Sequence, residues 1–168
     1  MDYNSFEHIK MTVDAGGSYS FAARVGLADF WPGSQGTDPA HANWHSTGGV
    51  ARRYGRPDEL EGVHAVPQKC GEAYAGAVAT LAGLTRSAQA GNSASAVLAI
   101  HDIQDSYAAG HLYQFWPGGL PSWAHLRGDA SFNTSPVDAT RAYLKALRGA
   151  APMQSPEHYL APRPANCN

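Results

Sequence analysis

The residues from Ser93 to Gly110 constrain the fold most, because they predict a helix that must be buried. The helix is apolar on two faces, at Ala94, Val97, Leu98, Ile100, Ile103 and Tyr107. A helix that is apolar on more than one side packs inside a protein. His101 and Asp105 lie on this buried helix, four residues apart and therefore on one face. A buried carboxylate without a partner is very unfavourable, so this pair needs a partner in the interior.

The remaining sequence predicts an all-α fold with a single domain over residues 1–168, in which helices alternate with long loops rich in glycine and proline. A chain of 168 residues has the size of one ordinary domain. No stretch alternates apolar and polar residues as a half-buried strand would. The tail is expected to be irregular from about residue 151. The other predicted helices cover residues 4–14, 18–27 with Ser18 as a cap, 67–89 with Pro67 at the first position, and 135–147.

Composition excludes some classes of protein. The net charge is −2, so the chain lacks the basic surface that usually drives nucleic-acid binding. No apolar run approaches the roughly 20 residues of a membrane span. The start MDYNSFEHIK has no signal-peptide pattern. Cys70 and Cys167 form either one disulfide or two free thiols, and without a CxxC motif neither predicts a zinc knuckle.

Five potential metal ligands fall between positions 101 and 129. His101, Asp105 and His111 are followed by His125 and Asp129, which repeat the four-residue spacing of the first pair. Taken alone, His101 and Asp105 are more simply explained as a buried hydrogen-bonded pair. Five such residues together favour a metal site, because zinc binds imidazole nitrogen and carboxylate oxygen.

This order of residues resembles the zinc-dependent phospholipases C of the bacterial alpha-toxin type and the related fungal and plant zinc nucleases. Those families carry His, three residues, Asp, five residues, His, and later His, three residues, Asp or Glu. The pattern HIKMT at His8 resembles the histidine that opens an early helix in the family. Asp29, with either His41 or His45, resembles a loop aspartate and histidine that lie between these regions. Of the two histidines, His45 fits the spacing of the nucleases better.

The resemblance implies two or three zinc ions and assigns a ligand set to each. The first ion takes Asp29, His45, His101 and Asp105. The second takes His111, His125 and Asp129. The third takes His8 and shares Asp105. Family enzymes begin with a tryptophan that completes the third site, whereas this chain begins Met1-Asp2, so the third site departs from the family pattern.

The chemistry implied is hydrolysis of a phosphodiester by metal-activated water, because clustered divalent ions activate water and neutralise phosphoryl charge. Asp29 is expected to be a ligand or a water-orienting base, and Asp105 to be a bridging ligand. The aromatic residues Phe30, Trp31 and Trp44 are expected to bind substrate, either a choline-like ammonium or a base; packing of the loops is the alternative role for them.

A phospholipase C-like enzyme acting on phospholipid headgroups is the leading prediction, and a zinc nuclease is the second, favoured by aspartate rather than glutamate at Asp129. A non-catalytic helical domain with structural zinc is the alternative of another class. We expect the chain to be secreted or delivered as part of a larger effector. If it is the toxin portion of such an effector, an immunity protein is the expected partner.

Overall fold

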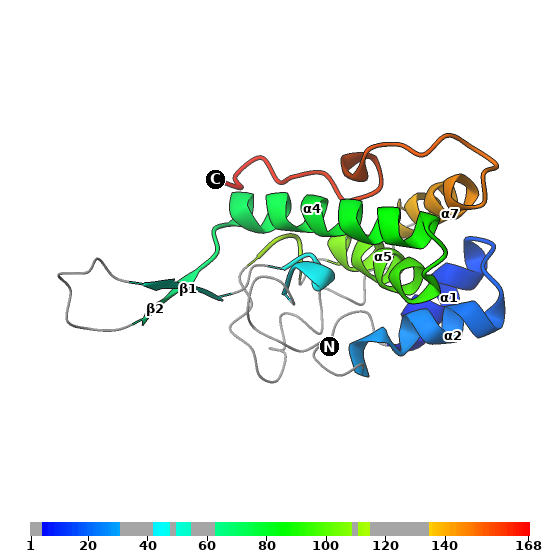
Figure 1. The fold of residues 1–168 in the computed structure, drawn as a ribbon, viewed down its shortest axis with the longest axis horizontal. Coiled ribbons are helices and arrows are strands. Elements are labelled where there is room, and N and C mark those ends of the chain that lie inside the picture. Colours follow the sequence, from blue (N-terminus) through cyan, green and yellow to red (C-terminus); the bar gives the residue numbers. More distant parts are fainter. Residues whose placement is uncertain (1–4, 31–41, 48–49, 55–62, 109–110, 115–134) are drawn as a thin grey trace.

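The computed structural model describes residues 5–30, 42–47, 50–54, 63–108, 111–114 and 135–168, and for Asp29 and residues 50–67 it describes no side chain. Within these ranges the fold has five α-helices, α1 (Ser5–Asp14), α2 (Tyr19–Gly26), α4 (Cys70–Gln89), α5 (Ser93–Ser106) and α7 (Ser135–Leu147), and Figure 1 shows their arrangement. Three short 3-10 turns accompany them: η1 (Ala28–Phe30), η2 (Asn43–His45) and η3 (Pro156–His158). The predicted all-α class is confirmed.

Helix α5 is the central element, as its sequence predicts. It packs against α4, α2 and α7 (Figure 1), and every residue from Ala99 to Ser106 is buried. Its apolar side chains join a core that includes Val25 of α2, Leu81 of α4 and Tyr143 of α7. Asn92, one residue before the predicted segment, caps the helix and accepts hydrogen bonds from the backbone of Ala94 and Ser95.

Helix α4 begins later than predicted, at Cys70 instead of Pro67. Glu72 accepts a hydrogen bond from the backbone N–H of Lys69 at 3.0 Å and so closes the first turn. Pro67 instead ends strand β2 (Val63–Pro67), which pairs antiparallel with β1 (Val50–Tyr54). The sequence did not predict this hairpin, which extends away from the helices in Figure 1.

The helices α1 and α2 form a tight antiparallel pair. Their closest approach is at Gly26, where an added side chain would collide with the Ser5 carbonyl group and the Ile9 side chain. Ser18 caps α2 as predicted, with its hydroxyl accepting from the Phe21 backbone. None of the helices in the described ranges is long and apolar enough to cross a bilayer.

The C-terminal segment is tied back across the helices. Cys70 at the start of α4 and Cys167 form a disulfide, which answers the question that the sequence left open. Along this segment the backbone N–H of Ala161 donates to the Ser106 hydroxyl at 2.9 Å, and the Ala161 carbonyl accepts from Tyr113 at 2.6 Å. The tail therefore covers the end of α5.

Candidate metal centre

Four histidines and one aspartate meet where α1, η2 and the end of α5 converge. His8 comes from α1, His45 ends η2, His101 and Asp105 lie on α5, and His111 lies just beyond it. All five are buried, and the most exposed, His45, shows 4% of its surface. The structure thus brings together five of the eight ligands that the sequence predicts.

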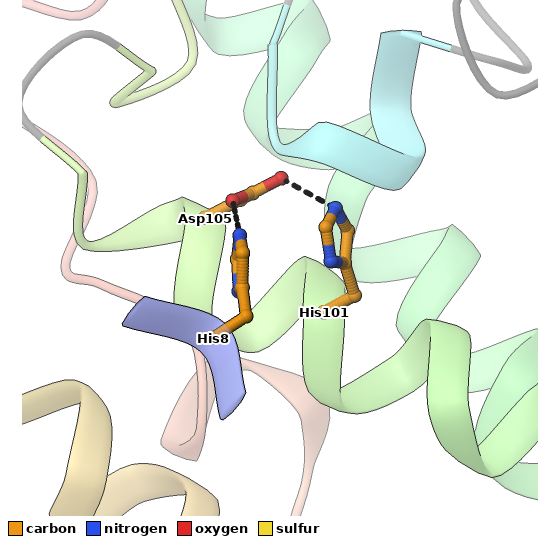
Figure 2. A group of neighbouring side chains, drawn as sticks. All are labelled: His8, His101 and Asp105. Atoms are coloured by element: carbon orange, nitrogen blue, oxygen red, sulfur yellow. Dashed lines mark ion pairs between the residues drawn. The ribbon is translucent and has the colours of Figure 1, made fainter. Parts of the chain in front are cut away.

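The carboxylate of Asp105 occupies the centre of this group. Its Oδ1 lies 3.2 Å from His8 Nε2, and its Oδ2 lies 2.9 Å from His45 Nδ1 and 3.2 Å from His101 Nε2. Figure 2 shows the carboxylate beside the nitrogen edges of both His8 and His101, with one oxygen toward each ring. The two rings stack on each other with centroids 4.3 Å apart. Each oxygen of Asp105 therefore faces a different set of imidazoles.

Backbone carbonyl groups orient two of the rings. His101 Nδ1 lies 3.2 Å from the Val25 carbonyl oxygen, and His111 Nδ1 lies 2.5 Å from the carbonyl oxygen of His45. A carbonyl only accepts, so each Nδ1 carries a proton and donates it. Nε2 is then the nitrogen left for a further partner, and in His101 it faces Asp105. Metal-binding histidines in proteins are held in this way by their second nitrogen.

The position of His45 depends on contacts of η2 with two helices. Gly76 of α4 leaves room for η2, because an added side chain there would collide with the Asn43 amide. On the other side the Ser46 hydroxyl donates to Asp102 Oδ1 of α5 at 2.7 Å. Ser46 itself has a left-handed backbone with φ of 49°, which is uncommon for a residue other than glycine. These contacts bring His45 to Asp105.

The electrostatics keep Asp105 ionised. Burial alone would raise the pKa of Asp105, but the charges of His101 and His111 and the hydrogen bonds from His101 and His45 outweigh it, so the pKa lies well below the ordinary value. Asp102, one turn earlier on α5, has the opposite shift. Burial raises the pKa of Asp102 well above the ordinary value, and the Ser46 hydrogen bond opposes this only in part.

These distances suit a metal ion. His45 Nδ1, His101 Nε2 and Asp105 Oδ2 form a triangle with edges of 2.9, 3.2 and 3.2 Å. Tetrahedral ligands at bond lengths of about 2.0 Å lie about 3.3 Å from one another. Ligand atoms of a second, overlapping group, His8, His101 and Asp105, all lie within 4.8 Å of one another. The centre is therefore a buried His–His–Asp group that could hold a metal ion.

The other predicted site residues are not placed by this geometry. Asp29 lies in η1, which continues from α2, but its side chain is not described. His125 and Asp129 of the predicted second site lie outside the described residues, as do His41 and Trp31.

Two of the predicted substrate-binding aromatics are described. Phe30 ends η1 and is 74% exposed, and Trp44 is half-buried in η2 beside His45. An exposed ring at Phe30 is compatible with substrate binding.

Sequence reasoning missed two polar residues of the centre. Gln104 contacts His8, and Ser46 holds the turn that carries His45. The signal for Gln104 was available, since it is a polar residue next to Asp105 on a helix predicted to be buried. Ser46 gave no comparable signal, because it follows a loop histidine.

Comparisons of this chain with protein-family models, with curated proteins and with solved structures find no match. The resemblance to zinc phospholipases C and zinc nucleases therefore rests on the motifs alone.

Proposed function

We propose that this chain is a zinc-dependent phosphodiester hydrolase of the phospholipase C kind. One observation carries the proposal: the buried Asp105 carboxylate faces His8 with one oxygen and both His45 and His101 with the other. A carboxylate shared in this way is the bridging ligand that the resemblance implies. It would link the ion held with His45 and His101 to the ion held with His8.

The chemistry of the donors favours zinc over harder or softer cations. The group offers imidazole nitrogens and one carboxylate, the ligands of catalytic zinc sites. Magnesium and calcium prefer sites made of oxygen atoms. Both cysteines of the chain are joined in the disulfide, so no thiolate competes for the ion.

A fully buried anionic oxygen also supports a cation at this place. Asp105 Oδ1 accepts no hydrogen bond from any residue in the described ranges, although it has no contact with solvent. A cation between Oδ1 and His8 would give this oxygen a partner.

Divalent ions at this centre would activate water and neutralise charge on the phosphoryl oxygens. The residues of the chain have separate tasks. His45 and His101 would hold the first ion and Asp105 would be shared with the second, while the carbonyls of Val25 and His45 keep the rings of His101 and His111 in place. Asp29 would complete the first set and orient water, and His125 with Asp129 would complete the set of His111. Phospholipid headgroups are the proposed substrate, and Phe30, Trp31 and Trp44 are the proposed substrate-binding residues.

Metal analysis of the purified protein, combined with three assays, tests the proposal. We expect at least two zinc ions per chain and turnover of phosphatidylcholine. Turnover of single-stranded DNA alone would identify a nuclease, the function that aspartate at position 129 favours. Bound zinc with no turnover of either substrate or of bis(p-nitrophenyl) phosphate would indicate structural zinc. A protein without bound metal would contradict the proposal.

The variant Asp105→Asn keeps the shape of the side chain and removes its charge, so we expect it to lose both zinc and turnover. Asp138→Asn is the matched control, because Asp138 lies on the surface of α7 and pairs with Arg141. If Asp105→Asn retained full zinc content and activity, the assignment of the site would be wrong.

A further inference from the structure

A fully buried amide stands directly behind the candidate metal centre. Gln104 precedes Asp105 on α5, and its side chain joins three helices. The amide oxygen lies 2.7 Å from His8 Nδ1 of α1, and the amide nitrogen donates to Thr12 of α1 at 3.0 Å and to Thr140 of α7 at 3.4 Å. All four residues have no exposed surface.

The two ends of an amide have different hydrogen-bonding capacities. The nitrogen carries two protons, and both threonine hydroxyls can accept one each. The oxygen carries none, so its contact with His8 requires that His8 Nδ1 donates. His8 then keeps its proton on Nδ1 and directs the lone pair of Nε2 toward Asp105.

The opposite amide orientation would give His8 a different role. With the amide nitrogen toward His8, the Nδ1 atom would accept, and Nε2 would carry the proton. An Nε2–H group would serve Asp105 as an ordinary hydrogen-bond donor and could not bind an ion. The structure has the first orientation, with the amide oxygen 2.7 Å from His8 Nδ1 and the amide nitrogen toward the two threonines.

We propose that Gln104 is a positioning residue that selects the Nδ1–H form of His8 and so makes His8 Nε2 a ligand of the ion shared with Asp105. The inference rests on the proposed metal centre. Thr12 and Thr140 accept from the amide nitrogen and hold it in place, and the amide oxygen holds the ring of His8. Outer partners of this kind change metal affinity by about 10–100-fold.

Two substitutions of Gln104 separate the effect of its hydrogen-bond acceptor from the effect of its shape. Gln104→Leu has a similar volume and no acceptor, and we expect it to weaken binding of one zinc ion about 10–100-fold in competition with a chelator. Gln104→Glu keeps an acceptor for His8, and both threonine hydroxyls can turn to donate to it, so we expect affinity within about threefold of wild type. Equal affinities of wild type and Gln104→Leu would overturn the inference.

A measurement on the metal-free wild-type protein covers the case in which Gln104→Leu does not fold. Long-range ¹⁵N–¹H NMR correlations distinguish the two neutral forms of a histidine ring, at about pH 8 where ordinary histidines are neutral. We expect the His8 signals, assigned by their loss in His8→Asn, to show a protonated Nδ1. A protonated Nε2 would overturn the inference whether or not zinc binds, whereas wild-type protein without zinc affinity would overturn the proposed function and leave the ring state measurable.

Discussion

Asp102 and Asp105 lie one turn apart on α5, both fully buried, and their surroundings shift the two pKa values in opposite directions. The pKa of Asp102 is raised well above its ordinary value, chiefly by burial, whereas the imidazoles around Asp105 overcome the same burial and lower its pKa. Asp102 meets a serine hydroxyl, and Asp105 meets three histidine rings. Two faces of one helix thus carry carboxyls with opposite pKa shifts.

The comparison shows that partners, more than burial, decide what a buried carboxyl does. Asp102 and Ser106 form hydrogen bonds with Ser46 and with the Ala161 backbone, so their face of α5 holds η2 and the tail in place. Imidazoles can carry charge or bind an ion, so the face with Asp105 suits a cation. We expect substitutions on the first face to affect stability and those on the second to affect metal binding.

The largest expected contrast is in metal content. Asp105→Asn should lower zinc affinity by more than about 100-fold, because even outer partners of a metal ligand contribute about 10–100-fold. Asp102→Asn should bind zinc as wild type does, since Asp102 is not one of the proposed ligands and asparagine also accepts from Ser46. Mass spectrometry of metal content and chelator competition measure both. Similar losses in the two variants would refute the division of α5 into two faces.

The second contrast concerns the tail that covers the end of α5. Replacing both Cys70 and Cys167 by serine should lower the free energy of unfolding by about 2–4 kcal/mol, because the disulfide closes a loop of 97 residues in the unfolded chain. Zinc affinity should stay within a few-fold of wild type, since neither cysteine lies on the face of α5 that carries Asp105. Urea unfolding with and without reductant is the measurement, and reductant should leave the serine variant unaffected. A loss of zinc that parallels the loss of stability would contradict this expectation.

The local parts of the site could be predicted from the sequence. The spacing of His101 and Asp105 fixes their common face once the segment is a helix, and the helix itself follows from its apolar pattern. The bounds of α7 were also predicted from local sequence, because Ser135-Pro136 favours the start of a helix.

The long-range parts required packing that no local pattern encodes. His8 reaches Asp105 across 97 positions and His45 across 60, and only the family resemblance indicated them. Gln104 was missed because its partners Thr12 and Thr140 come from two other helices. Pro67 misled the prediction of α4, since proline suits both the first turn of a helix and the end of an edge strand.

A smaller effect should appear in the pH dependence of stability, measured without metal. Because the pKa of Asp102 is raised by folding, its contribution to stability is full below the unfolded value of 3.8 and is lost as pH rises through the folded pKa. Relative to Asp102→Asn, wild type should therefore lose up to about 1.4 kcal/mol per pH unit across that range. Urea titrations of both proteins at several pH values measure the difference. Parallel pH profiles would show that Asp102 is not held neutral.

The smallest effect tests whether the hydroxyl face is structural only. Ser106 donates to the Ile103 carbonyl at 2.7 Å and accepts from the Ala161 backbone N–H at 2.9 Å. Ser106→Ala leaves that buried N–H without its side-chain partner, so the free energy of unfolding should fall by about 1–2 kcal/mol. Ser95→Ala is the control on the same helix, because its hydroxyl bonds only to the Ser87 side chain among the described contacts, and it should cost about half as much. Ser106 also neighbours Asp105, so unchanged zinc affinity in Ser106→Ala would show that the two faces remain separate even between adjacent residues, whereas a weakened zinc site would show that the tail helps to position the ligand.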